Sequence, residues 1–261
     1  MAEIIIPTTK LRHYYEFLSK FTNEAARDYM AESICKSIQR KKDLKKHERK
    51  IDTLIKIVME SMIHFKQYCN IENFVNDTSS RIKLVSKNLK NGEYGDDKEV
   101  MLDIIHTNTF LETDETKREI DPRRATLSKY ESGTSAKGSG GGGIDLLAWD
   151  TNTDTPFIGE IKTHSDKDAF YALIQLLTYF TELSTPNQIE RSNLHNLFPN
   201  KLKKSQKFSL GVIFSDFSKR SDVQILKNTK AIAQYIAKEI KQISYINFLN
   251  MEKPFMNFQV L

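Results

Sequence analysis

Residues 140–179 read GGGGIDLLAWDTNTDTPFIGEIKTHSDKDAFYALIQLLTY, and the predicted fold depends on this stretch. A glycine run leads into an apolar segment that carries one acid, Asp145. After a turn-rich connector, a second apolar segment carries Glu160 and Lys162, and residues with helical spacing follow. We therefore predict two neighbouring strands and then a helix, with these charged side chains at the edge of a small sheet.

The charged residues of the second strand are predicted to share one face. Side chains alternate along a strand, so Glu160 and Lys162 project together while Gly159 and Ile161 point the other way. Charges inside an apolar strand are costly unless they face a polar cleft or are paired. If the two strands are neighbours, Asp145 joins Glu160, and both carboxylates converge with the lysine on one site.

Two carboxylates and a lysine suit the metal-dependent cleavage of phosphodiesters. A divalent cation lowers the pKa of a bound water and neutralises developing oxyanion charge. Mg²⁺ prefers oxygen ligands, which Asp145, Glu160 and the backbone carbonyl of Ile161 would supply, and Mn²⁺ is expected to substitute. Lys162 would orient the attacking water or stabilise the transition state. The sequence therefore predicts a nuclease site.

The tripeptide Glu-x-Lys is not informative by itself, because it occurs four times in the chain. The copies at 48–50 and 239–241 lie in charged helical sequence, and the copy at 115–117 lies in a polar segment. Only Glu160–Lys162 lies in an apolar, strand-like run that follows a second apolar strand with a single acid. The alternative is an ion pair between Glu160 and Lys162 on an edge strand, with Asp145 at a strand start.

The pattern Ile144-Asp145-x14-Glu160-Ile161-Lys162 resembles the PD-(D/E)XK nuclease superfamily, in which one acid begins a strand and a (D/E)xK tripeptide follows on the next. Ile144 stands where a proline often precedes the first acid. Four residues apart on the predicted helix, Gln175 and Tyr179 share a face. This pair is similar to the Gln-x-x-x-Tyr motif of the branch that contains RecB-type and lambda-exonuclease-type nucleases.

The resemblance implies an α/β, restriction-endonuclease-like core, in which helices flank a mixed central sheet. It also implies that Gln175 and Tyr179 help to position the active site and the substrate. The alternative for this pair is an amide and a phenol packed at a helix–sheet boundary. Members of the superfamily usually have a further acid on a helix before the sheet, and the candidates here are Glu60, Glu99, Asp103 and Glu112.

The first part of the chain, 1–111, is predicted to be mainly helical, and 112–261 is predicted to be the nuclease core. An apolar stripe at helical spacing is formed by Ile51, Leu54, Ile55, Val58, Met59 and Met62. The basic segment 36–50 is either a solvated helix face or a phosphate-contacting patch. Residues 99–111 resume a helical pattern. Residues 112–143 are almost devoid of large apolar side chains, as expected of a mobile loop.

Beyond the two predicted strands, helices and strands alternate. A helix is predicted over 166–183, capped by Ser165 or Asp166, with a buried stripe of Phe170, Leu173, Ile174, Leu177 and Phe180. A connector at 185–200, a strand at 208–214, a helix at 221–241 and a strand at 243–249 follow. Alternation of this kind predicts that at least the later strands are parallel.

Composition sets broad bounds on the function. The formal charge of +5 is compatible with DNA as a partner but does not establish one. The two cysteines form no zinc or disulfide pattern, and no run approaches the ~20 apolar residues of a membrane span. We therefore expect a cytoplasmic protein that does not enter a membrane. The chain has no G-x-x-x-x-G-K-[ST] loop, so any ATP-driven step requires a partner.

Three functions fit these observations. The first is a Mg²⁺-dependent nuclease that cleaves DNA, which by resemblance suggests the nuclease component of an anti-phage defence system with a separate helicase or ATPase. The second is a catalytically silent or partner-gated subunit that binds nucleic acid. The third is an RNA-directed nuclease, because nothing in the chain distinguishes recognition of the 2′-hydroxyl from its absence.

Overall fold

The computed structural model describes residues 10–40, 48–65, 87–89, 100–107, 122, 143–162, 168–194, 196–215, 223–252 and 257–260. The described helices are α1 (Lys10–Phe21), α2 (Glu24–Ile38), α3 (Lys50–Phe65), α4 (Ala169–Leu183), α5 (Pro186–Leu194) and α6 (Val223–Glu239). The described strands are β1 (Lys87–Leu89), β2 (Val100–Thr107), β3 (Leu146–Asp150), β4 (Thr155–Lys162), β5 (Phe208–Ser215), β6 (Ile243–Glu252) and β7 (Asn257–Val260). Among these residues, no helix is long and apolar enough to cross a membrane.

The seven described strands form one mixed sheet in the order β1-β2-β3-β4-β5-β6-β7. The strands β3 and β4 pair as an antiparallel hairpin, and β4 pairs in parallel with β5, as β5 does with β6. The connections between these parallel strands contain α4 with α5, and then α6. The predicted α/β class and the predicted parallel pairing of the later strands are therefore confirmed.

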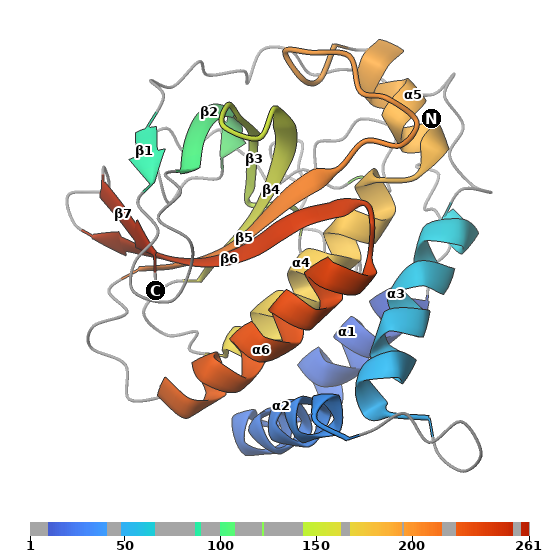
Figure 1. Ribbon diagram of the computed structural model, residues 1–261, viewed down its shortest axis with the longest axis vertical. Coiled ribbons are helices and arrows are strands. Elements are labelled where there is room, and N and C mark those ends of the chain that lie inside the picture. The colour runs from blue at the N-terminus through green and yellow to red at the C-terminus, as the bar shows by residue number, and fades with distance from the viewer. Residues whose placement is uncertain are drawn as a thin grey trace, which may run out of the picture.

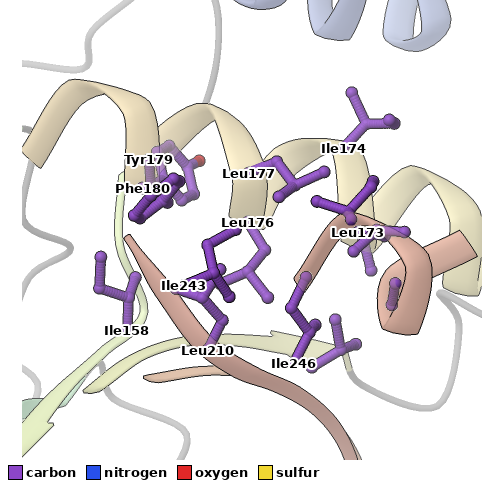
Figure 2. Packing of buried hydrophobic residues seen from close by; sticks show 14 of the residues in the cluster. Ile158, Leu173, Ile174, Leu176, Leu177, Tyr179, Phe180, Leu210, Ile243 and Ile246 are labelled. Carbon is purple, nitrogen blue, oxygen red and sulfur yellow. The ribbon is translucent and has the colours of Figure 1, made fainter. Parts of the chain in front are cut away.

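One face of the sheet is covered by two layers of helices. Figure 1 shows α4 and α6 lying side by side against the sheet, with α1, α2 and α3 on their far side. The larger hydrophobic core lies between these layers and includes residues from all five helices. In Figure 2, Leu176 of α4 points toward Leu210 and Ile243 of the sheet region. The N-terminal helices therefore share a core with the sheet-covering helices.

The opposite face of the sheet has a smaller apolar cluster. It consists of Leu102, Leu146, Ala148, Phe157, Ile161, Ile213 and Leu249, with Tyr245 packed against it. Two glycines allow this cluster to pack closely. A Cβ at Gly159 would lie 2.9 Å from the Cβ of Leu146, its cross-strand partner, and a Cβ at Gly211 would overlap the tip of the Phe157 ring.

The prediction of a helix over 99–111 is wrong, because residues 100–107 form strand β2. This strand pairs with β3 in an antiparallel register that begins at Leu102 and Asp150, so it belongs to the same sheet as the later strands. Short apolar runs fit helical and strand spacing equally well. The β-branched residues Val100, Ile104 and Ile105 favour a strand, and pairing satisfies the backbone groups along the open edge of β3.

Several predicted boundaries also need correction. The N-cap of α4 is Asp168, whose carboxylate accepts a hydrogen bond from Tyr171 N at 2.8 Å, rather than Ser165 or Asp166. The predicted connector 185–200 contains the helix α5. Met59 of the predicted stripe is 52% exposed, whereas Ile51, Leu54 and Val58 are buried. The predicted loop 112–143 lies outside the described residues except for Pro122 and Gly143.

The packing of Phe157 against Gly211 generates a prediction. We expect Gly211→Ala to lower the free energy of unfolding by about 1–3 kcal/mol, because a fully buried ring must move to admit the methyl group. Denaturant titration measures this change. Phe157→Leu combined with Gly211→Ala should cost less than the sum of the two single changes, since the smaller side chain makes room. Strict additivity would show that the two positions do not compete for space.

Candidate active site

Strand β4 directs Glu160 and Lys162 toward the helices. Ile158, which alternates with them, belongs to the core under α4, whereas Phe157 and Ile161 belong to the cluster on the opposite face. The prediction that the acid and the lysine share one face is therefore consistent with the packing of their neighbours. The alternation follows from the pleat of the strand, which sends successive side chains to opposite faces.

Asp145 lies immediately before β3, at the point where this strand runs beside the charged part of β4. Leu146 is the register partner of Gly159. The Asp145 carboxylate accepts a hydrogen bond from the backbone N–H of Ile161, with Oδ2 and N 2.9 Å apart. This bond joins the start of β3 to the segment between Glu160 and Lys162. The structure therefore brings the two predicted carboxylates to the same part of the sheet.

The ammonium group of Lys162 is held from three directions. Its Nζ lies 2.9 Å from Glu160 Oε1 and donates a 2.8 Å hydrogen bond to Gln175 Oε1. It also lies 5.1 Å from the centroid of the Tyr171 ring, within the range of a cation–π interaction. Asp145, Glu160 and Lys162 are 5%, 1% and 5% exposed. Burial strengthens these polar contacts, because little water competes for them.

The pair Gln175 and Tyr179 on α4 extends the contacts of the lysine. Gln175 Nε2 donates a hydrogen bond to Tyr179 Oη at 3.0 Å, and the spacing of four residues along the helix permits this contact. Both side chains are buried. The amide therefore bridges the ammonium and the phenol. The two side chains pack at the boundary between helix and sheet, and Gln175 also contacts the lysine of the predicted site.

The environment keeps the phenol of Tyr179 neutral. Burial raises the pKa of Tyr179 well above its usual value of 10, and the negative charges of Glu160 and Asp145 add to this effect. Nearby positive charge from Arg12 acts in the opposite direction but is outweighed. The influence of both carboxylates on one phenol is a second indication that the carboxylates lie close to each other. At neutral pH the tyrosine retains its proton.

The donor chemistry of the site fits a hard divalent cation. Asp145 and Glu160 supply carboxylate oxygens, and Ile161 N bonds to Asp145, so the peptide group of Ile161 lies beside the same carboxylate. Mg²⁺ is commonly held by one or two carboxylates, with substrate phosphate and water completing its coordination. In the described part of the chain, no cluster of three or more His, Cys, Asp or Glu could hold a metal ion.

Residues of the N-terminal helices that sequence reasoning missed lie against this site. Arg12 is fully buried and forms two hydrogen bonds with the equally buried Glu182 of α4. Tyr15 stacks on Tyr171, with ring centroids 5.2 Å apart. A signal was present in the sequence, because Arg12 falls within an apolar stripe of α1 that includes Leu11 and Leu18. A charge at such a position requires a buried partner.

Of the four candidate helix acids, the structure describes Glu60 and the backbone of Asp103. Glu60 on α3 forms an ion pair with Lys10 at 2.5 Å and is partly exposed. Asp103 lies in the strand β2 and not on a helix. Glu99 and Glu112 lie outside the described residues. Residues 41–47 of the basic run 36–50 also lie outside them. In the described part of that run, Arg49 forms an ion pair with Asp52 and donates a hydrogen bond to Tyr235.

Comparison with family models, curated proteins and solved structures finds no match to this chain.

The buried tyrosines generate a prediction about pH. Burial is the largest cause of the raised pKa values of Tyr14, Tyr15, Tyr179 and Tyr245, and the pKa of Tyr14 rises to about 12. The unfolded chain releases these protons near pH 10, so the stability that the neutral phenols contribute is complete below pH 10 and is lost as pH rises through the folded-state values. We expect unfolding experiments to show stability falling steadily above pH 10.

Phenolate absorbance in the near ultraviolet tests the same point on the native protein. Of the 10 tyrosines, the buried Tyr15 and Tyr179 and the partly buried Tyr14 and Tyr245 should ionise only well above pH 10. Tyr179→Phe should leave the early part of the titration unchanged, because burial raises the pKa of Tyr179 well above 10. Ionisation of all ten near pH 10 in a folded chain would contradict the prediction.

Proposed function

We propose that this protein is a metal-dependent nuclease that hydrolyses DNA phosphodiester bonds, with a restriction-endonuclease-like core of the PD-(D/E)XK type. The observation that carries this proposal is the convergence of Asp145, Glu160 and Lys162 in one buried polar cluster, tied to Gln175 and Tyr179 by hydrogen bonds. Strand β4 pairs with β3 and β5, so it is not an edge strand. An ion pair alone would not require the helix to supply an amide to the lysine and a phenol to that amide.

The two carboxylates are the proposed metal ligands. Asp145 and Glu160 would hold Mg²⁺, with Mn²⁺ as a substitute and the Ile161 carbonyl as a further ligand. When bound, the cation neutralises phosphate charge and lowers the pKa of the attacking water. The hydrogen bond from Ile161 N orients the Asp145 carboxylate before any substrate arrives. Preorganisation of this kind reduces the reorganisation needed during reaction.

Lys162 is the proposed catalytic cation. Its ammonium lies between an acid and an amide, so it has a fixed position from which to orient water or stabilise charge on the phosphate oxygens. Gln175 holds the ammonium directly, and the neutral phenol of Tyr179 holds Gln175. In this scheme Gln175 and Tyr179 are positioning residues that act through the lysine.

The topology supports this assignment without deciding it. An antiparallel hairpin is followed by a helix and a parallel strand, an order compatible with a restriction-endonuclease-like core. A role in anti-phage defence beside a helicase or ATPase partner remains part of the proposal, and it rests on the resemblance of the Gln-x-x-x-Tyr segment and on the lack of an ATP-binding loop in the sequence.

Cleavage of linear, circular and single-stranded DNA tests the proposal. We expect cutting with Mg²⁺ or Mn²⁺ and none with EDTA. Glu160→Gln and Lys162→Ala should each lower the rate by at least about 100-fold, because each removes a group that acts on the reacting phosphate. The matched controls are Glu239→Gln and Lys241→Ala, which alter an exposed copy of the same tripeptide and should retain full activity.

The outcomes of this experiment separate the three functions. Cutting of RNA instead of DNA would change the proposed substrate to RNA and leave the assigned catalytic residues unchanged. Salt-sensitive binding of DNA without cutting by any protein, including the wild type, would favour a silent or partner-gated subunit. Cutting that survives Glu160→Gln would reject the assigned site, whatever the substrate.

Metal binding can be tested without cleavage. A cation that binds only the folded chain stabilises it by about 2.7 kcal/mol when present at about a hundred times its dissociation constant. We expect Mg²⁺ to raise the unfolding temperature of the wild type and not that of Asp145→Asn/Glu160→Gln, which keeps the size of both side chains but removes their charge. Equal stabilisation of both proteins would place the cation elsewhere.

A further inference from the structure

A fully buried ion pair joins the N-terminal helices to the helix of the candidate site. Arg12 of α1 donates from Nε to Glu182 Oε1 at 2.9 Å and from Nη2 to Glu182 Oε2 at 2.6 Å. Both side chains are 0% exposed. The two parallel hydrogen bonds fix the plane of the guanidinium group, so its position is defined as well as its charge.

The same guanidinium lies against two tyrosine rings. Its Cζ is 5.4 Å from the ring centroid of Tyr15 and 5.4 Å from that of Tyr179. Tyr179 accepts the hydrogen bond from Gln175, and Gln175 accepts the hydrogen bond from Lys162. A continuous series of contacts therefore runs from α1 to the ammonium group of the candidate catalytic lysine.

A second series of contacts reaches Lys162 from the same side. Tyr171, whose ring faces the ammonium, stacks on Tyr15 of α1. The guanidinium of Arg27 on α2 also lies 5.0 Å from the Tyr171 ring centroid and pairs with Asp168, the N-cap of α4. Helices α1 and α2 thus both contact Tyr171, one of the two α4 side chains that touch the lysine.

Stability alone gives a weak reason for a buried ion pair at this place. Removal of two charges from water costs as much as, or more than, their attraction returns, and well-packed apolar residues of similar volume often replace such pairs at no loss of stability. A pair that instead fixes the orientation of neighbouring rings has a reason to be ionic. Arg12 contacts the rings of Tyr15 and Tyr179, and both tyrosines are linked to Lys162 through one further side chain. An ion pair that orients these rings fits this arrangement.

We propose that Arg12, held by Glu182, is a positioning residue for Lys162, and that the N-terminal helices are therefore part of the active site. The guanidinium fixes the ring of Tyr179, the phenol fixes Gln175, and the amide fixes the ammonium. This inference rests on the proposed function for its catalytic meaning, but the positioning itself can be measured without nuclease activity.

The test is the rate at which a small acetylating reagent modifies Lys162, measured by mass spectrometry on the intact chain. The variant is Arg12→Met/Glu182→Met, which replaces the pair by apolar side chains of similar length and leaves no lone buried charge. We expect acetylation of Lys162 to rise by about tenfold, because the ammonium gains access to water through local opening. Lys230 on α6, which is partly buried, and the exposed Lys241 should react at unchanged rates.

A second variant protects the test against failure to fold. Arg12→Lys keeps a positive charge for Glu182 but lacks the planar, two-pronged contact, so it should release Lys162 in part while the protein stays folded. Unchanged acetylation of Lys162 in both folded variants would overturn the inference. Equal rises at Lys162 and Lys230 would also overturn it, because they would reveal general loosening instead of a specific role.

Activity measurements then separate this inference from the proposed function. In a cleaving enzyme, Arg12→Met/Glu182→Met should lower kcat by about 10- to 100-fold with little change in KM. Combined with Lys162→Ala, it should cause no further loss, because it acts through the lysine. A rise in acetylation without cleavage by the wild type would retain the positioning role and reject the nuclease. Cleavage by the wild type, with unchanged acetylation of Lys162 in the variants, would retain the nuclease and reject the positioning role of Arg12.

Discussion

Asp145, Glu160 and Lys162 bring charge into a sheet face that is otherwise apolar, and the surrounding structure is arranged to compensate for it. Each charge has a partner at hydrogen-bonding distance, whether the backbone N–H of Ile161, the neighbouring acid or the amide of Gln175. A buried charge without such partners would cost several kcal/mol. The helix α4 must therefore lie where its amide reaches the lysine, and this requirement adds to the apolar packing that holds the helix on the sheet.

The same requirement extends to helices far from the hairpin in sequence. Residues 10–38 form α1 and α2, which lie behind α4 and contribute Arg12, Tyr15 and Arg27 to the polar and aromatic surroundings of α4. Arg12 and Tyr15 are buried beside the larger core, and Arg27 and Tyr171 are partly buried at its edge. The N-terminal helices are thus built into the environment of the candidate site, although sequence reasoning had treated them as a separate helical region.

Sequence reasoning succeeded where local pattern and burial agree. The alternation in β4, the apolar stripe of α4 and the contact between Gln175 and Tyr179 follow from strand and helix periodicity, which needs no knowledge of the rest of the chain. It failed where distant partners decide. Residues 100–107 form a strand because β3 offers an open edge, and the partner of Arg12 lies 170 residues away in Glu182. No local signal specifies either pairing.

Strand β4 contributes to both faces of the sheet, and this has a consequence for how the protein can change. Its charged residues alternate with Phe157 and Ile161, and the ring of Phe157 fills the space left by Gly211 on β5. A shift of one residue in pairing would exchange the charged and apolar sets, so the fit of an aromatic ring on one face fixes the alignment of the acids on the other. Substitutions on the face of Phe157 are therefore constrained by the charged residues on the other face, although the two sets are not in contact. Redesign of either face of β4 has to consider both faces together.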